Sequence, residues 1–139
     1  PRFSHHREVL MHRCHSVFLA AAIAALALMP ATAWSEDISG EWVSETVYKD
    51  GSSTKTIFEF NVDGSKVTGS VLSYMDEFPI LNGKIKGDKV SFIREERVRD
   101  RVFSHLYEGK ISGDTIKFNV TRLTGPGRNS KFTARRIRQ

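Results

Sequence analysis

The sequence has few of the residues that build disulfides and metal centres. Its 139 residues include one cysteine, Cys14, which precedes an apolar run at residues 17–29. If that run is removed as a signal, the mature chain has no thiol, which excludes disulfide bonds, cysteine metal sites and a cysteine nucleophile. The mature chain also has a single histidine, His105, so a site with two histidine ligands is excluded. No phosphate loop, nucleophile elbow or cofactor motif is present, and we expect no metal and no cofactor.

The sequence also lacks an apolar run long enough to span a membrane. Residues 17–29 are apolar, whereas a spanning helix needs about 20 residues. Arg13 precedes the run and Ala31-Thr32-Ala33 follows it, which together make the charged start, apolar core and A-x-A site of a cleavable signal peptide. We therefore expect residues 1–35 to hold upstream residues and a signal-peptide helix, and residues 36–139 to form one mature domain. That domain would be secreted or periplasmic, with no stable membrane span after cleavage.

A strong charge of one sign is missing as well. The net charge is +5 at pH 7, and 18 of the 21 Lys and Arg residues and 15 of the 16 Asp and Glu residues follow residue 35, which leaves about +3. The basic residues are spread along the chain, so this composition does not predict a nucleic-acid partner. The basic end at residues 135–138 is expected to be a solvated terminal strand.

No mature segment shows a helical period, and turn signals recur every 8–12 residues or so. This pattern is typical of an all-β sandwich or barrel, and short links favour a single antiparallel up-and-down barrel of about eight strands. The expected strands are residues 38–48, 54–62, 66–73, 80–86, 89–98, 102–111, 115–122 and 131–138. Residues 74–79, 99–101 and 123–130 are expected to be connections.

One stretch occurs twice and fixes the register. Residues 83–92 and 109–118 both read G-K-I-x-G-D-x-(V/I)-x-F. If Gly-Asp is a two-residue loop, Ile85 faces Val90 and Ile111 faces Ile116. Glycine at the first loop position suits a type II′ turn, because that position needs φ > 0. These turns and Asp63-Gly64 fall at one end of a meander, so the longer connections form an opposite, open end, where binding is expected.

Alternation from the two hairpins points a polar set toward the barrel interior near the open end. Ionisable side chains on an inward face need partners or water. The set comprises Arg94, Glu96, His105, Tyr107 and Arg122. Three explanations remain open: a bulge that turns Arg94 and Glu96 outward, internal ion pairs that fill the barrel end, or a polar mouth that binds one end of a ligand. An acid–base pair of Glu96 with His105 is the weakest alternative, and we expect no enzyme.

The first and last strands must pair to close the barrel. Trp42 starts the first strand, and alternation from Phe132 and Ala134 turns Arg136 inward at the same end. An arginine over an indole face stabilises by about 0.5–2 kcal/mol. We therefore predict a closing pair of Trp42 and Arg136.

The Gly40-x-Trp42 pattern with a basic residue on the last strand resembles the calycin pattern of lipocalins and avidins. That resemblance implies an up-and-down barrel enclosing a small ligand. The chain lacks the C-terminal helix of lipocalins and the tryptophans of an avidin biotin site. Over nearly all of the mature length, the doubled hairpin and the F-T-A-R-R end at residues 132–136 resemble small exported bacterial β-barrel domains of unknown function.

The functional prediction is a non-enzymatic domain that binds a small or extended ligand at its open end. The alternative is a periplasmic protein-interaction module, such as an inhibitor or envelope accessory protein, that acts through its loops. An open cavity would favour the ligand, and a filled barrel with an ordered 123–130 loop would favour the protein partner.

Overall fold

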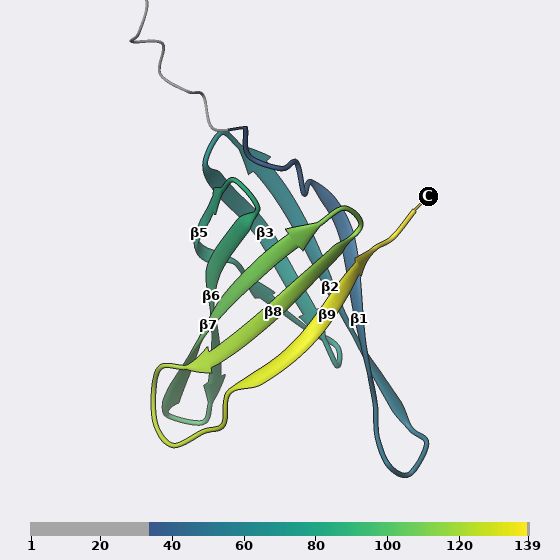
Figure 1. Ribbon diagram of the computed structural model, residues 1–139. Coiled ribbons are helices and arrows are strands. Elements are labelled where there is room, and N and C mark those ends of the chain that lie inside the picture. Colours follow the sequence, from purple (N-terminus) through teal and green to yellow (C-terminus); the bar gives the residue numbers. More distant parts are fainter. Residues whose placement is uncertain (1–33, 139) are drawn as a thin grey trace, which may run out of the picture. The chain divides into compact units, whose positions relative to one another are not determined.

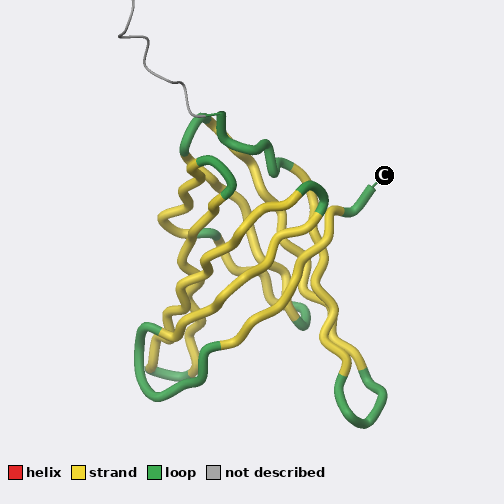
Figure 2. The backbone as a smooth tube through the Cα atoms, viewed as in Figure 1, coloured by secondary structure: helices red, strands yellow, loops and turns green. Residues whose placement is uncertain are grey.

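The computed structural model describes residues 34–138, and the predicted signal peptide up to residue 33 lies outside the described residues. Every regular element within the described part is a strand (Figures 1 and 2), so the all-β prediction is confirmed. The strands are β1 (Gly40–Val47), β2 (Ser53–Asp63), β3 (Lys66–Ser73), β4 (Asp76–Pro79), β5 (Leu81–Lys86), β6 (Lys89–Val98), β7 (Arg101–Ser112), β8 (Thr115–Arg122) and β9 (Ser130–Arg136). Residues 34–138 contain no helix long and apolar enough to cross a membrane.

Eight of these strands close into an antiparallel barrel. The sheet order is β2-β1-β9-β8-β7-β6-β5-β3-β4, and an additional pairing of β2 with β3 joins the two sides. The short β4 is an extra strand, which pairs with β3 just before the chain continues into β5. The predicted up-and-down barrel is therefore confirmed, with one strand more than expected.

The doubled hairpin has the predicted register. Ile85 pairs with Val90 across the first turn, and Ile111 pairs with Ile116 across the second. The first loop residue has φ near +60° in both turns, 59° at Gly87 and 58° at the second glycine, as a type II′ turn requires. The β2–β3 hairpin uses the same device, since its loop begins at Gly64 with φ 61°.

Several local predictions were wrong, including the end of the last strand, which lies at Arg136 and not at residue 138. Asp76–Pro79 was expected in a connection, but it forms β4, after a two-residue turn at Tyr74 and Met75. Both turn residues have positive φ, which non-glycine residues seldom adopt, so composition gave no turn signal there. The β6–β7 link has two residues instead of three, because Val98 pairs directly with Arg101. The first strand begins at Gly40, two residues later than expected.

The connections separate into the two predicted ends. The β2–β3, β5–β6 and β7–β8 turns lie at the upper end in Figure 1, and the β1–β2, β3–β4, β6–β7 and β8–β9 links lie toward the lower end. The β4–β5 link at Ile80 lies between the two ends, opposite Gly69 of β3. The segment before β1 also crosses the upper end, where Ile38 is fully buried and the Glu36 amide donates to the Gly87 carbonyl at 3.1 Å. This end is therefore closed by an apolar side chain as well as by tight turns.

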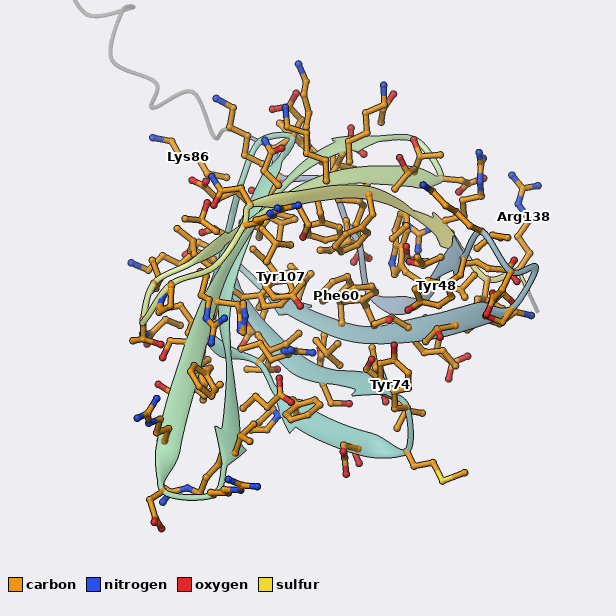
Figure 3. The ribbon with its side chains drawn as sticks, turned by 90° about the horizontal axis from the view of Figure 1, so that it is seen from below. Tyr48, Phe60, Tyr74, Lys86, Tyr107 and Arg138 are labelled. Carbon is orange, nitrogen blue, oxygen red and sulfur yellow. The ribbon has the colours of Figure 1, made fainter. Side chains whose placement is uncertain are left out.

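Aromatic rings fill the centre of the barrel. Phe58 stacks on Phe118 with ring centroids 5.4 Å apart, and Phe92 stacks on Tyr107 at 4.7 Å. Phe60 and Tyr107 both point into the barrel (Figure 3), and Phe132 packs against the cluster from β9. Aromatic pairs at these separations add about 0.5–1.5 kcal/mol each to the free energy of their burial. The interior between the two ends is thus a packed core.

Close backbone approach explains a glycine inside β3. Gly69 has φ 137°, and a Cβ at this position would collide with the carbonyl oxygen of Glu59 on β2. A glycine inside a strand often marks such a close approach of a neighbouring backbone. The Ile80 amide donates to the Gly69 carbonyl at 2.9 Å, where β4 gives way to β5.

Candidate functional site

Three predicted site residues form one row across neighbouring strands at the open end. His105 on β7 pairs with Arg94 on β6 and with Arg122 on β8. The β6–β7 register is continuous from Lys89↔Lys110 to Val98↔Arg101, which excludes the bulge that would have turned Arg94 outward. Neighbouring strands lie about 4.8 Å apart, so the imidazole is bracketed by two guanidinium-bearing residues.

Arg94 is largely buried and is held by two contacts. Its side chain is 14% exposed, and its Nη2 atom donates to Oε2 of Glu96 at 3.2 Å. Its guanidinium lies over the ring of Phe78 on β4, 4.6 Å from the centroid. The ion pair that was one of the three explanations is therefore present. The strand that the sequence did not predict supplies the aromatic surface beneath Arg94.

Arg122 is held by the loop that follows β8. Its guanidinium lies over the Phe103 ring at 4.2 Å, and its Nε atom donates to the Thr124 carbonyl at 3.0 Å. The loop returns to β7, where the Leu123 amide donates to the Ser104 carbonyl and the Ser104 amide donates to Oγ1 of Thr124. The 123–130 loop is thus anchored beside the row at its first residues.

The surroundings of His105 favour its uncharged form. Burial lowers the pKa of its imidazole below 6.5, the charges of Arg94 and Arg122 lower the pKa further, and Glu96 opposes them. Its Nδ1 atom and the Nε atom of Arg94 are buried without a hydrogen-bond partner among residues 34–138. Buried polar atoms in proteins nearly always have hydrogen-bond partners, so these two atoms indicate that the row has unused hydrogen-bonding capacity.

Tyr107 forms the floor beneath this row. It is 7% exposed, and it pairs with Phe92 on one side and Val120 on the other. Burial raises the pKa of its phenol above 10, so the hydroxyl stays protonated. The five predicted site residues therefore lie together, with Tyr107 as part of the core and Glu96 bound to Arg94.

The contacts of Glu96 lie away from His105. Glu96 is paired with Arg94, and its strand partner is Phe103, so Glu96 does not orient His105. Within the part of the chain that the structure describes, no three His, Cys, Asp or Glu side chains gather as a metal site. The row can instead offer hydrogen-bond donors and positive charge to an anion.

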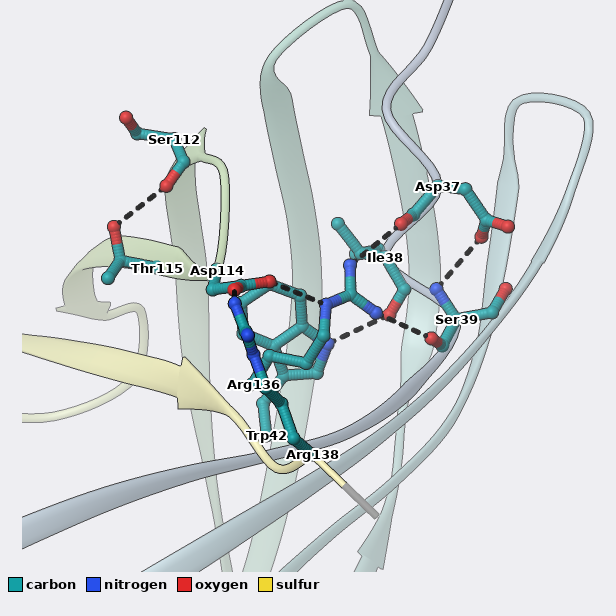
Figure 4. A network of polar contacts seen from close by, with 9 residues as sticks. All are labelled: Asp37, Ile38, Ser39, Trp42, Ser112, Asp114, Thr115, Arg136 and Arg138. Carbon is teal, nitrogen blue, oxygen red and sulfur yellow. Dashed lines mark hydrogen bonds and ion pairs between the residues drawn. The ribbon is translucent and has the colours of Figure 1, made fainter.

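At the closed end, Arg136 lies over Trp42, with its guanidinium 4.4 Å from the ring (Figure 4). The predicted contact is present, and the two residues are strand partners. Arg136 also donates from Nη1 to the Ser39 carbonyl at 3.0 Å and from Nη2 to the Asp37 carbonyl at 2.9 Å. The indole Nε1 donates to the Ile38 carbonyl at 2.8 Å, so both members tie down the segment before β1.

Asp114 adds a carboxylate that sequence reasoning assigned only to a turn. One oxygen lies 3.4 Å from Nε of Arg136, and the other accepts from Arg138. A hydrogen bond from Arg138, together with the positive charges of Arg138 and Arg136, lowers the pKa of the Asp114 carboxyl. The β7–β8 turn is therefore linked to the β9 strand end by charge (Figure 4).

Comparisons with protein-family models, with curated proteins and with solved structures returned no match to this chain.

Proposed function

We propose that this chain is an exported, non-enzymatic β-barrel domain that binds the anionic end of an extended ligand at its open end. The supporting observation is the Arg94–His105–Arg122 row, which has two guanidinium groups and one carboxylate bound to Arg94, and in which two buried nitrogens have no hydrogen-bond partner among residues 34–138. A ligand carboxylate complements such a row, because charge-assisted hydrogen bonds to guanidinium are about twice as strong as neutral ones.

The packed interior determines how such a ligand would lie. Aromatic rings occupy the barrel between the row and the closed end, and Tyr107 forms the floor. A ligand would therefore present one end to the row while the rest of it extended over the loops. This favours an extended molecule over a small one enclosed by the barrel.

We infer that the domain is not an enzyme from the ion pair between Glu96 and Arg94. A general base needs a substrate proton within hydrogen-bond reach and a pKa near the working pH. Glu96 is bound to Arg94, and the lowered pKa of His105 leaves a weak base between two cations. Binding without turnover fits these groups best.

Export and calycin-like architecture are further parts of this proposal. Export is supported by the signal-peptide pattern at residues 13–33. Kinship with calycins is supported by the closed barrel and by the first-strand Trp42 beneath the last-strand Arg136. Mapping the N-terminal peptide of the protein from its native cell tests export. A chain that still begins upstream of residue 17 would oppose it.

The binding proposal is tested by NMR on isotope-labelled protein. Short peptides with a free C-terminal carboxylate should shift the signals of His105 and its strand neighbours, and the same peptides with an amidated C-terminus should not. Arg94→Gln and Arg122→Gln should each weaken binding about tenfold or more, as expected for loss of a charged hydrogen bond. Arg97→Gln, exposed on the same strand, is the matched control. Equal shifts from amidated peptides, or equal losses in the control, would refute the proposal.

A second candidate function is protein interaction, supported by an exposed apolar cluster at the lower end. The hydroxyl groups of Tyr48 and Tyr74 form a hydrogen bond of 2.9 Å. Their sequence neighbours Val47 and Met75 are exposed. Met75 is 99% exposed and sits at φ 141°, a strained conformation for a side-chain-bearing residue. Aromatic residues and Met are enriched at protein interfaces.

Photo-crosslinking separates the two candidates. A photoreactive residue at position 75 should capture one discrete partner in the native compartment, and Tyr74→Asp should abolish that capture. The same probe at position 98, an exposed valine in the β6–β7 hairpin, is the control. Capture of the same species from both positions would exclude a specific interface at Tyr74 and Met75.

A further inference from the structure

Lysines that are scattered along the sequence form one row on the outer wall of the barrel. Lys86 pairs with Lys89, Lys89 pairs with Lys110, and Lys110 pairs with Lys117. We call these four residues the lysine row. It crosses β5, β6, β7 and β8, and three strand spacings make it about 14 Å long. All four side chains are exposed, and Lys86 points away from the barrel in Figure 3.

A second row lies directly beside the first on the same face. It runs from β3 to β9 through paired residues, and we call it the flanking row. Its members are Lys66, Lys84, Ser91, Glu108, Asn119 and Lys131. The two rows thus hold seven lysines with one carboxylate among them, Glu108. The net charge of the chain, +5, is small enough that this concentration on one face is a property of the fold.

Fold stability does not account for the lysine row. Like charges that face each other across strands destabilise a sheet, by an amount comparable to what opposite charges contribute. The only ion pair of the row among the described residues is a loose one, 4.0 Å from Nζ of Lys110 to Asp88, and both side chains are largely exposed. Three directly opposed lysine pairs therefore remain uncompensated. A bound anion would relieve this repulsion.

The surface between the rows is hollowed. A groove of about 530 Å³ is lined by lysines of both rows and by polar groups between them. Its polar side chains are Lys84, Lys86, Lys89, Ser91, Glu108, Lys110, Lys117 and Asn119. The groove runs across the strands, so a chain lying in it would meet a new ammonium group at each strand.

From this geometry we propose that the lysine row and its groove bind an acidic polysaccharide. Carboxylate or sulfate groups along such a chain would face the ammonium groups, and Ser91, Glu108 and Asn119 offer hydrogen bonds to sugar hydroxyls. Lysine suits this partner, because its ammonium acts as a flexible point charge and does not demand the planar geometry that arginine prefers.

Two other polyanionic partners fit less well. Single-stranded nucleic acid is bound by aromatic side chains on which bases stack, and no aromatic residue lines this groove. A membrane surface is bound by apolar side chains beside the basic ones, and the exposed large apolar residues of the described part lie outside both rows. Lys86 and Lys89 of the lysine row flank the β5–β6 turn at the closed end, whereas Lys131 of the flanking row lies at the start of β9, just after the open-end loop.

Calorimetric titration with an oligogalacturonate tests the proposal. The full-length mature protein should bind it at low salt, with an affinity that falls as salt rises. The double variant Lys110→Glu, Lys117→Glu should weaken binding about tenfold or more. The control double variant Lys49→Glu, Lys55→Glu makes the same change in net charge on the β1–β2 hairpin and should change the affinity less than about twofold. In this variant the Lys89↔Lys110 pair becomes a pair of opposite charges, whereas positions 110 and 117 remain a pair of like charges, so the melting temperature should change little.

Two further titrations test the alternative partners. An oligodeoxythymidylate of matched charge and vesicles of phosphatidylglycerol with phosphatidylcholine are titrated in parallel. If either binds more tightly than the oligogalacturonate and depends on Lys110 and Lys117, the polysaccharide assignment is overturned. Equal weakening by the control variant, or no binding of oligogalacturonate at low salt, also overturns it. The open-end proposal is unaffected by these outcomes, since Arg94 and Arg122 are unchanged in both variants.

Discussion

Replacing Arg136 with alanine should open one of the two seams of the barrel that have the fewest register pairs. β1 and β9 share only two register pairs, Trp42↔Arg136 and Val43↔Arg135, whereas β1 and β2 share eight. The Arg136 side chain is 28% exposed and adds its stack on Trp42 and two donated hydrogen bonds to this seam. This short seam therefore depends strongly on one side chain.

The magnitude follows from these contacts. The cation–π contact contributes about 0.5–2 kcal/mol, and a hydrogen bond from a charged group contributes about 1.5–3 kcal/mol when buried. Because both accepting carbonyls lie near the surface, the lower ends of these ranges apply, and Arg136→Ala should cost about 3 kcal/mol. In a domain of this size that loss lowers the melting temperature by roughly 10–20 °C.

Thermal and denaturant unfolding measure the loss, and tryptophan emission locates it. Trp34 is 90% exposed and would mask the signal of the fully buried Trp42, so the experiment uses a Trp34→Phe background. Emission of Trp42 should shift to longer wavelength in Arg136→Ala. Arg135→Ala, on the opposite face of the same strand, is the control and should change stability by less than about 0.5 kcal/mol. A melting temperature and spectrum that match the control would refute the closing role of Arg136.

Three further predictions concern single positions. Because the pKa of His105 is lower in the folded than in the unfolded chain, stability should fall as pH drops from about 7 toward 5, and His105→Gln should remove that dependence in urea unfolding curves. In Gly113→Ala the added methyl group meets no atom within 4 Å, so the variant should lose only about 1–2 kcal/mol of stability because of the positive φ. In Gly69→Ala the methyl group would collide with β2, so β2 and β3 should fail to pair, which circular dichroism would detect. Met75→Gly should raise stability by about 0.5–1 kcal/mol in the same assay, since it removes a strained φ without loss of packing; a loss of stability would mean that the turn is not strained.

Local sequence predicted the parts of the fold that local geometry determines. The doubled Gly-Asp turns gave the register of two hairpins, because glycine at the first loop position permits only a few turn types. The β3–β4 turn was not predicted, because Tyr74 and Met75 adopt positive φ although neither is a residue type that usually signals such a turn. There the surrounding strands impose the backbone conformation.

The residues of the candidate site could be predicted from the sequence, but their contacts could not. Alternation placed Arg94 and His105 on the inward face, but the ring beneath Arg94 belongs to Phe78, on a strand that the sequence did not reveal. The lysine row was missed for a related reason. A three-residue β6–β7 link would shift the register by one residue and separate Lys89 from Lys110, and the actual link has two residues.

The seam at Trp42 and Arg136 also has a consequence for the order of folding. These residues are separated by nearly the whole described chain, whereas the II′ hairpins join residues only a few positions apart. Closing so long a loop costs entropy before any contact repays it, so the hairpins should form early and the β1–β9 seam late. Contacts made late stabilise the native state more than the transition state. The arginine of the last strand should therefore govern how slowly the barrel unfolds, and hardly affect how fast it folds.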